Sequence, residues 1–354
     1  MTTISEKVSP TRTTRPVSKR VSQSVFDGSR LRVVLLVDVY DGAQQQFLEA
    51  YEQLCNQVAQ VPGHVSDQLC QSIENPSQWL ITSEWESAPP FLAWVNSEEH
   101  VQMVKPLHNC VRDTRSLRFH VVRETGGPAA DSVRVLQAAP RMGDGVIRHA
   151  LTFTVRPGSE AEVAKILANY ASPKADVDDT TRLIRTSLYM HGNRVVRAIE
   201  VRGELMAALR HVARQPEVRA VEEAINPYLE QERDLNDQES ARVFFTRAAL
   251  PAVHHVSADE LAEGERHALY YPARPGCGMR LAELLAQHDE AAAEDPESPV
   301  LHSTVFQRDD VVVRLVEHRP GEAVDVTPAQ ALTALLDGDA VRMQLITDRR
   351  SPDA

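Results

Sequence analysis

The stretch from Pro76 to His108 reads PSQWLITSEWESAPPFLAWVNSEEHVQMVKPLH. Its first part alternates as a β-strand does, and period-two geometry places Trp79 and Trp85 on the same face. Pro89-Pro90 stops this strand and starts a helix that carries several large apolar side chains. Because a large exposed aromatic patch is unusual in a monomeric protein, we expect the helix to fold back over the tryptophan face.

A strand and a helix packed in this way would enclose an apolar chamber. The expected wall residues are Trp79, Ile81, Trp85, Phe91 and Trp94, and the expected rim residues are His100 and His108. One interpretation makes the tryptophans ordinary core residues. The other makes the chamber a pocket for a flat aromatic ligand. The sequence leaves both open.

Further elements surround this stretch. We expect a strand over 31–39, a helix whose apolar stripe runs from Phe47 to Val58 and ends at Pro62-Gly63, a strand over 64–72 and a last strand over 116–124. The resulting order, βαββαβ, is that of a ferredoxin-like module. We therefore predict an α+β first domain over 31–125.

An internal repeat extends this organisation to the rest of the chain. Residues 148–168 read RHALTFTVRPGSEAEVAKILA, and residues 266–286 read RHALYYPARPGCGMRLAELLA. The shared letters align without gaps, as repeated structural units do. We expect a second module over 146–250 with its last strand at 242–247, and a third over 265–350, separated by linkers near 125–145 and 251–264.

The whole chain is thus predicted to contain tandem ferredoxin-like modules of the dimeric α+β barrel type. Modules of this type pair through their sheets, so we expect the second and third to form a pseudo-dimer within the chain. The first module is expected to pair with another copy and give a homodimer.

Composition limits the partners. The 354 residues carry a net charge of -12, which argues against nucleic acid or an anionic membrane surface as partner. Four cysteines without CxxC spacing indicate reduced packing residues in a cytoplasmic protein. There is no transmembrane run. Residues 1–30 lack the core of a secretory signal and are expected to form a disordered tail.

Standard cofactor signatures are missing: the sequence has no GxxxxGK[ST], no GxSxG and no HExxH, and we expect no cofactor and no metal. The candidate ionisable residues are His64, His100 and His108, each either a surface histidine or a base at the pocket mouth. The pair His254-His255 lies in the second expected linker and is interpreted as solvated. The repeated Arg148-His149 and Arg266-His267 are interpreted as structural.

The tryptophan spacing, the FLAWVNSEEH helix and His100 give the first module a resemblance to the antibiotic biosynthesis monooxygenase fold. The wider chain, including PGHVSDQLCQSIENPSQWLITSEWES and INPYLEQERDL, resembles the SchA/CurD-like proteins encoded with type II polyketide synthases. The resemblance implies oxygenation of an aromatic polyketide by dioxygen without flavin, haem or metal.

The same resemblance places Trp85 at the family's cavity-lining strand tryptophan. Ile81 stands where characterised anthrone oxidases have asparagine, and Phe91 stands where the family has tyrosine. In the second module, Glu200 takes the place expected for the tryptophan. We therefore expect a cofactor-independent monooxygenase forming a quinone or a hydroxylated ring. The alternative is a non-catalytic protein that steers cyclisation. Such a protein would bind either the polyketide or the cyclases that fold it.

Overall fold

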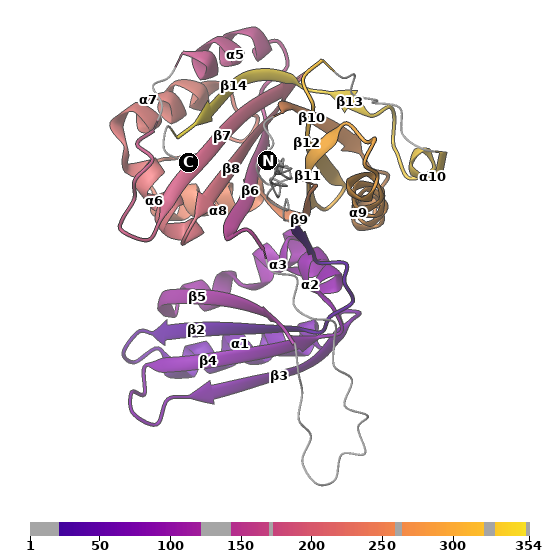
Figure 1. Cartoon of the computed structure of the whole chain (residues 1–354). Coiled ribbons are helices and arrows are strands. Elements are labelled where there is room, and N and C mark those ends of the chain that lie inside the picture. Colours follow the sequence, from indigo (N-terminus) through magenta and orange to yellow (C-terminus); the bar gives the residue numbers. More distant parts are fainter. Residues whose placement is uncertain (1–20, 122–142, 170–172, 259–263, 322–329, 352–354) are drawn as a thin grey trace, which may run out of the picture.

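The computed structural model describes residues 21–121, 143–169, 173–258, 264–321 and 330–351. The first twenty residues of the expected tail and most of the first expected linker lie outside these ranges. Figure 1 shows the first module below, and the second and third modules side by side above it.

The first module has the predicted βαββαβ order. Its elements are β2 (Leu31–Val39), α1 (Gln44–Val58), β3 (His64–Gln71), β4 (Gln78–Trp85), α2 (Ala88–Val95), α3 (Glu98–Met103), α4 (Lys105–His108) and β5 (Val111–His120). The four antiparallel strands lie in the order β3-β4-β2-β5. Strand β5 begins five residues before the predicted start, because it is a polar edge strand with little apolar alternation.

The second module is β6 (Val146–Thr154), α5 (Glu160–Ala168), β7 (Arg182–His191), β8 (Arg194–Arg202), α6 (Leu205–Arg214), α7 (Pro216–Ile225), a 3-10 turn (Asn226–Tyr228), α8 (Gln238–Ala248) and β9 (Ala249–Ser257). The third is β10 (Glu265–Pro272), α9 (Gly278–Glu294), β11 (Val300–Arg308), β12 (Val311–His318), α10 (Gln330–Thr333), β13 (Val341–Arg342) and β14 (Gln344–Arg350).

The strand predicted at 242–247 is wrong, because these residues form helix α8 and the strand follows it as β9. Phe244 and Ala248, four residues apart, bury one helical face in the core of the second module. Pro251 favoured a linker in the sequence, yet it lies within β9 opposite His149. His254 and His255 are consequently buried, and the prediction of a solvated pair is also wrong.

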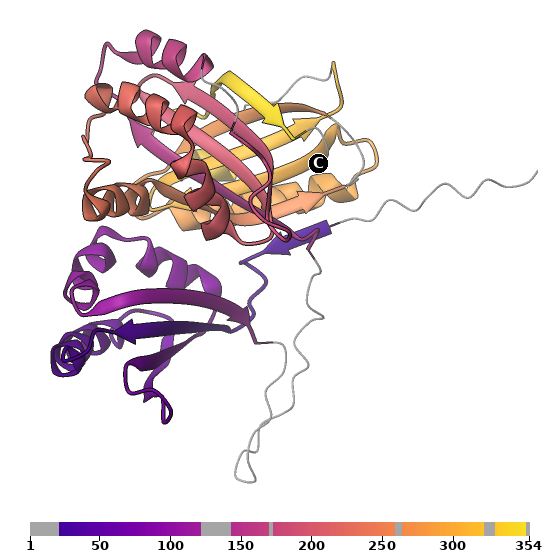
Figure 2. The ribbon, with the colours of Figure 1, turned by 90° about the vertical axis from the view of Figure 1, so that its left-hand side faces the viewer.

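The predicted pseudo-dimer is confirmed by the sheet order β13-β10-β12-β11-β9-β6-β8-β7-β14. Strand β9 of the second module pairs with β11 of the third, and β14 at the end of the chain pairs with β7 of the second. Figure 2 shows β14, in yellow, running beside the strands of the second module. The two modules therefore share one nearly closed barrel with helices outside it.

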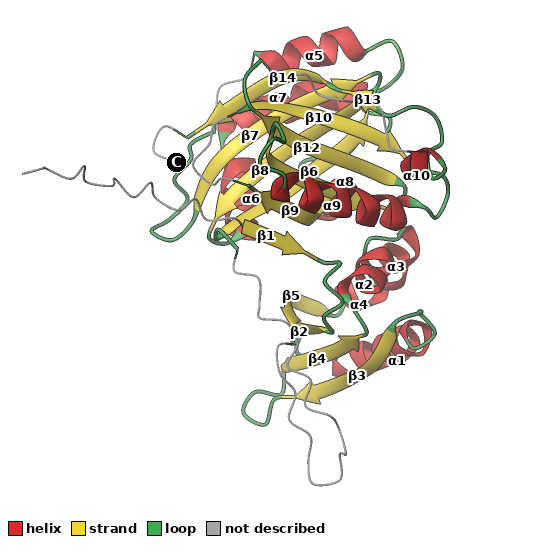
Figure 3. Ribbon diagram, turned by 45° about the vertical axis from the view of Figure 1, so that its right-hand side comes forward, coloured by secondary structure: helices red, strands yellow, loops and turns green. Residues whose placement is uncertain are grey.

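Residues assigned to the disordered tail also join this barrel. Strand β1 (Val21–Ser24) pairs with β9, and Val21 is 1% exposed. Figure 3 shows β1 between the first module and the barrel. The expected boundary at residue 30 is therefore wrong, since Val21–Ser24 already form a strand of the barrel. The cause is a short strand without apolar alternation, VSQS, which resembles a tail in composition.

One cross-strand pair recurs in all three modules. Arg32 lies opposite Glu84 in the first module, Arg148 opposite Glu200 in the second and Arg266 opposite Glu317 in the third. In the first module the pair lies on an open sheet face. In the other two modules the equivalent faces look into the barrel, where these four side chains are at most 14% exposed.

Arg266 joins the two halves of the barrel. Its Nη2 donates to Glu200 Oε1 at 2.6 Å, and its Nε donates to Glu317 Oε1 at 2.6 Å. Burial alone would raise the pKa of Glu200, but Arg266, Arg148 and Arg185 outweigh burial and lower it. Glu200 is therefore held ionised inside the barrel.

We predict that Arg266→Leu lowers the free energy of unfolding by about 3–5 kcal/mol, because removal of one partner leaves buried carboxylates uncompensated. The measurement is urea denaturation followed by far-UV circular dichroism. The repeat-equivalent Arg32→Leu removes a guanidinium that is 49% exposed, and we expect it to change stability by less than about 1 kcal/mol. Equal effects of the two substitutions would contradict the assignment.

Candidate functional site

Trp85 stands at the end of β4, where α2 folds back over the sheet as predicted. Its side chain is completely buried, and its Nε1 donates to Ser83 Oγ at 2.7 Å. Trp94 stacks on it, with ring centroids 5.5 Å apart and planes 27° apart. Phe91 and His64 approach with their ring edges, at 5.4 and 5.2 Å. These neighbouring aromatic side chains therefore cover the Trp85 ring and the part of the sheet on which it lies.

The expected single chamber is not what these residues form. Trp79 and Ile81 share the strand face with Trp85, but they pack in a different cluster, where Trp79 contacts Phe47 at 5.4 Å. Trp85, Phe91 and the half-buried Trp94 belong to a cluster that continues into the third module. The space beside Trp85 is filled by side chains of this chain, because a helix of this aromatic content packs against the indole rather than away from it.

His100 lies against the outer member of the tryptophan stack. Its ring centroid is 4.3 Å from that of Trp94, in edge-to-face geometry. Ser97 caps α3 by accepting from the His100 backbone N–H at 3.1 Å, which fixes the position of the residue. Nδ1 of His100 is buried and has no hydrogen-bond partner in the described part of the chain.

The charge state of His100 follows from this environment. Burial, with His108 and Arg118 nearby, lowers the pKa of His100 to about 4. The imidazole is therefore neutral at pH 7. A neutral, buried imidazole with a free ring nitrogen is a potential proton acceptor.

The other two candidate histidines each lie against a charged side chain. His64 lies at the start of β3 with its Nε2 2.9 Å from Asp67 Oδ2. Both ring nitrogens of His108 face the guanidinium of Arg242 on α8, at 2.8 and 3.0 Å. The structure thus brings His64 and His100 to opposite ends of the stack of Trp85 and Trp94, whereas His108 serves the contact with the second module.

This aromatic cluster lies where the first module meets the barrel, between the two bodies seen in Figure 1. Arg247 of α8 donates to Glu98 at 2.6 Å, and the same contact lowers the pKa of Glu98. Arg308 of β11 donates to the backbone oxygen of Asn96 at 2.9 Å. Residues of both the second and the third module therefore hold the region where α2 ends and α3 begins.

Strand register corrects the expectation for Glu200. Because Arg148 pairs with Glu200 as Arg32 pairs with Glu84, Glu200 is equivalent to Glu84 and not to Trp85. A shift of one residue moves a side chain to the opposite face of a sheet. Val201 and His318 occupy the positions equivalent to Trp85.

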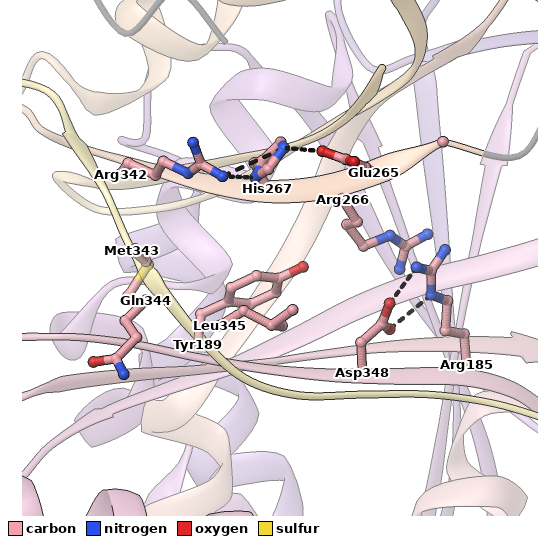
Figure 4. A pocket seen from close by; sticks show the side chains of 11 residues that line it. Arg185, Tyr189, Glu265, Arg266, His267, Arg342, Met343, Gln344, Leu345 and Asp348 are labelled. Carbon is pink, nitrogen blue, oxygen red and sulfur yellow. Dashed lines mark hydrogen bonds and ion pairs between the residues drawn. The ribbon is translucent and has the colours of Figure 1, made fainter. Parts of the chain in front are cut away.

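Sequence reasoning missed a second group of ionisable residues. Arg185, Tyr189, Arg266 and Asp348 line a cavity of about 640 Å³ at the barrel seam, together with residues of β13 and β14 (Figure 4). The repeated RHAL motif was the available signal, since it contains Arg266 and His267. Its repetition alone indicates a structural role and does not indicate a cavity.

Two observations bear on cofactors and membranes. Within the described ranges, no group of three or more His, Cys, Asp or Glu side chains is arranged to hold a metal ion. The same ranges contain no helix of the length and apolarity needed to span a bilayer.

Comparison with known proteins identifies the chain's relatives. The antibiotic biosynthesis monooxygenase model matches residues 30–106, and the SchA/CurD like domain model matches residues 146–258. The polyketide synthase CurD of Streptomyces cyaneus is 60% identical over 364 residues, which covers 94% of this chain and 98% of CurD. The chain belongs to the SchA/CurD family.

Two further family members match over nearly their whole length. The 42.8 kDa protein in the whiE locus of Streptomyces coelicolor is 60% identical, covering 94% of this chain and 90% of that protein. Protein SchA of Streptomyces halstedii is 57% identical, covering 95% of this chain and 97% of SchA. The family match to 258 also includes β9, which lies beyond the domain boundary expected at residue 250.

We predict that the His100 imidazole titrates with a midpoint near pH 4, because its buried site disfavours the charged form. The measurement is an NMR titration of chain labelled with ¹³C at histidine, with the His100 signal identified by its loss in His100→Gln. Since the folded pKa lies below the unfolded value, His100 contributes stability above about pH 6.5 and loses this contribution as the pH falls toward 4. A midpoint above pH 6 would contradict this environment.

Proposed function

We propose that this SchA/CurD family member is a cofactor-independent monooxygenase that oxidises an aromatic polyketide at the cluster of Trp85, Trp94 and His100. The observation that carries the proposal is the buried, unpartnered Nδ1 of a neutral His100 beside the tryptophan stack. The family match of residues 30–106 and the polyketide synthase name of CurD support the substrate class.

The reaction requires a proton acceptor and a surface for a flat ring. An anthrone or phenolic ring loses a proton to His100 and gives a resonance-stabilised anion. The anion passes one electron to dioxygen, the radical pair combines to a peroxide, and loss of water leaves the quinone. A CH₂ group and O₂ thus become C=O and H₂O. The substrate anion would raise the pKa of His100, because an opposite charge stabilises the imidazolium.

Binding requires a movement of α2. The Trp94 indole occupies the face of Trp85 on which a planar ring would stack, at 5.5 Å and 27°. Because Trp94 is half-buried and Trp85 is not exposed, we infer that the substrate displaces Trp94 and leaves Trp85 in place. The dry environment then favours electron transfer from the anion over exchange with water.

We predict that the purified protein consumes one O₂ for each quinone formed from an anthrone, without added flavin, nicotinamide or metal. Trp85→Ala is expected to abolish this uptake. His100→Gln is expected to lower kcat by about 100-fold or more, the usual contribution of a general base. The measurement is oxygen uptake, with a chelator-treated sample run in parallel.

The matched control is His120→Gln, at the exposed end of β5, which should leave uptake unchanged. Because Trp85→Ala removes a fully buried side chain, circular dichroism must show that the variant is folded before its activity is interpreted. Uptake equal to the spontaneous rate in the wild type would contradict the oxygenase.

The second candidate is a non-catalytic protein that binds the polyketide or a polyketide cyclase. The observation that favours it is the complete burial of Trp85, whose ring faces are already occupied by this chain. Tight binding of the anthrone without uptake above the spontaneous rate would support this candidate. A product pattern that changes only when cyclases are present would support it as well.

We also propose that the first module forms a homodimer through the face of its sheet opposite α1. Leu36 and Phe119 are 43% and 50% exposed there, beside the half-buried Val34 and Leu80. The positions equivalent to Val34, namely Ala150 and Ala268, are 0% exposed inside the barrel. The second and third modules bury this face against each other, so the first module has an apolar face that a second copy would cover.

We predict that light scattering after size exclusion gives twice the chain mass for the wild type and the single chain mass for Leu36→Lys. A lysine on the contact face would have to be buried without a partner. The control Ile73→Lys changes a fully exposed loop residue and should remain dimeric. A wild type with the single chain mass at micromolar concentration would refute the dimer.

A further inference from the structure

Strands β13 and β14 cross the seam of the barrel and leave a gap between strands there. Strand β13 pairs with β10 through Val341 and Arg342, whereas β14 pairs with β7. The strands β10 and β14 therefore separate beyond Met343, whose N–H still donates to Ala268 at 2.9 Å. The cavity of about 640 Å³ lies at this separation, and Figure 4 shows side chains from β7, β10 and β14 around it.

At the opposite seam of the barrel, an additional strand covers the equivalent edge. Strand β9 corresponds to β13 and β14 in the second module: its first residues pair with β6 and its later ones with β11. The edge of β9 left free by β6 is paired with β1, from Val21 to Ser24. The two seams are thus equivalent in topology, and β1 occupies only one of them.

The cavity contains a buried polar group without a well-formed hydrogen bond. Tyr189 is 0% exposed, and although the side chain of Ser187 lies close to its hydroxyl, no described residue forms a hydrogen bond of normal geometry with it. Figure 4 shows this hydroxyl directed toward the space below β10. A buried hydroxyl without a partner is unfavourable by about 1–3 kcal/mol, so its presence in a cavity indicates a ligand atom that pairs with it.

The charges around the cavity are unevenly compensated. Arg185 is paired with Asp348 and Glu317, at 2.8 Å each, and Arg266 is paired with Glu200 and Glu317. Arg342, in contrast, contacts His267, and no carboxylate pairs with it among the residues that the structure describes. Burial and Arg342 hold the pKa of His267 at about 4, so that this ring is neutral. The guanidinium of Arg342 thus carries an uncompensated positive charge at the cavity.

Apolar side chains complete the lining. Leu345 is 46% exposed although it lies on a strand of the barrel, and the buried Met343 precedes it. Apolar surface next to a cation and a hydroxyl suits a ligand with one acidic oxygen and an apolar body.

We propose that this cavity is a second binding site, which takes a small anionic aromatic compound, a carboxylate or phenolate. Its acidic oxygen accepts from the Tyr189 hydroxyl, the guanidinium of Arg342 at the same cavity supplies the compensating positive charge, and its ring lies against Leu345 and Met343. The site is separate from the aromatic cluster of the first module, and it does not depend on the oxygenase proposal.

The test is isothermal titration calorimetry of the full chain with 1-hydroxy-2-naphthoate, which carries a carboxylate, a phenol and a fused ring. The wild type is expected to bind one molecule per chain. Arg342→Gln is expected to weaken binding by about tenfold or more, because it removes a charge-assisted hydrogen bond. Tyr189→Phe, which keeps the ring, is expected to weaken binding by about three- to tenfold.

Two control variants test whether the compound binds at this cavity. Arg280→Gln makes the same charge change on the exposed surface of α9 and should leave the affinity unchanged. Trp85→Phe should also bind normally, so that failure of the oxygenase proposal and failure of this site are distinguishable. Absence of binding heat, or binding that survives both Arg342→Gln and Tyr189→Phe, would overturn the proposal.

Discussion

The buried contact of Arg266 with Glu200 and Glu317 joins the two halves of the barrel. Glu200 belongs to the second module, whereas Arg266 and Glu317 belong to the third, so a single guanidinium bridges the two modules across the barrel. Arg185 of the second module reaches Glu317 at 2.8 Å and closes the network from the other side. Because each ion would be unfavourable when buried alone, the modules must meet in one register. This constraint makes the second and third modules a single structural unit.

Because the second and third modules pair with each other, the equivalent sheet face of the first module stays open. The second and third modules bury the sheet face that contains their arginine and glutamate pairs, whereas the first keeps the equivalent face open, with Arg32 and Glu84 near solvent. Its other face packs Trp85 under Trp94 and His100 and contacts the barrel through Glu98 and Arg247. The chain thus combines a module that carries a buried aromatic cluster with a barrel that contacts this module and holds its own cavity.

Much of this architecture is predictable from the sequence. Two tryptophans at period-two spacing, two prolines and the RHAL repeat predict three α+β modules and the internal pairing, because these signals are local or repeated. The aromatic candidates around Trp85 are found for the same reason. Strand β9 was missed because Pro251 and His254-His255 are typical of a linker in sequence. Only the pairing of β9 with β6 and β11, which are distant in sequence, makes this segment a strand. The seam cavity was missed because Tyr189 and Arg342 are 153 positions apart, and only the crossing of β14 brings them together.

The most direct test of the account is native-state hydrogen exchange, read by mass spectrometry, in the wild type and in Arg266→Leu. If the network makes one body of the second and third modules, peptides from β7 and β8 and peptides from β11 and β12 should gain exchange equally in the variant, while those of the first module stay unchanged. Faster exchange confined to the third module would contradict the account, since the two modules would then open independently.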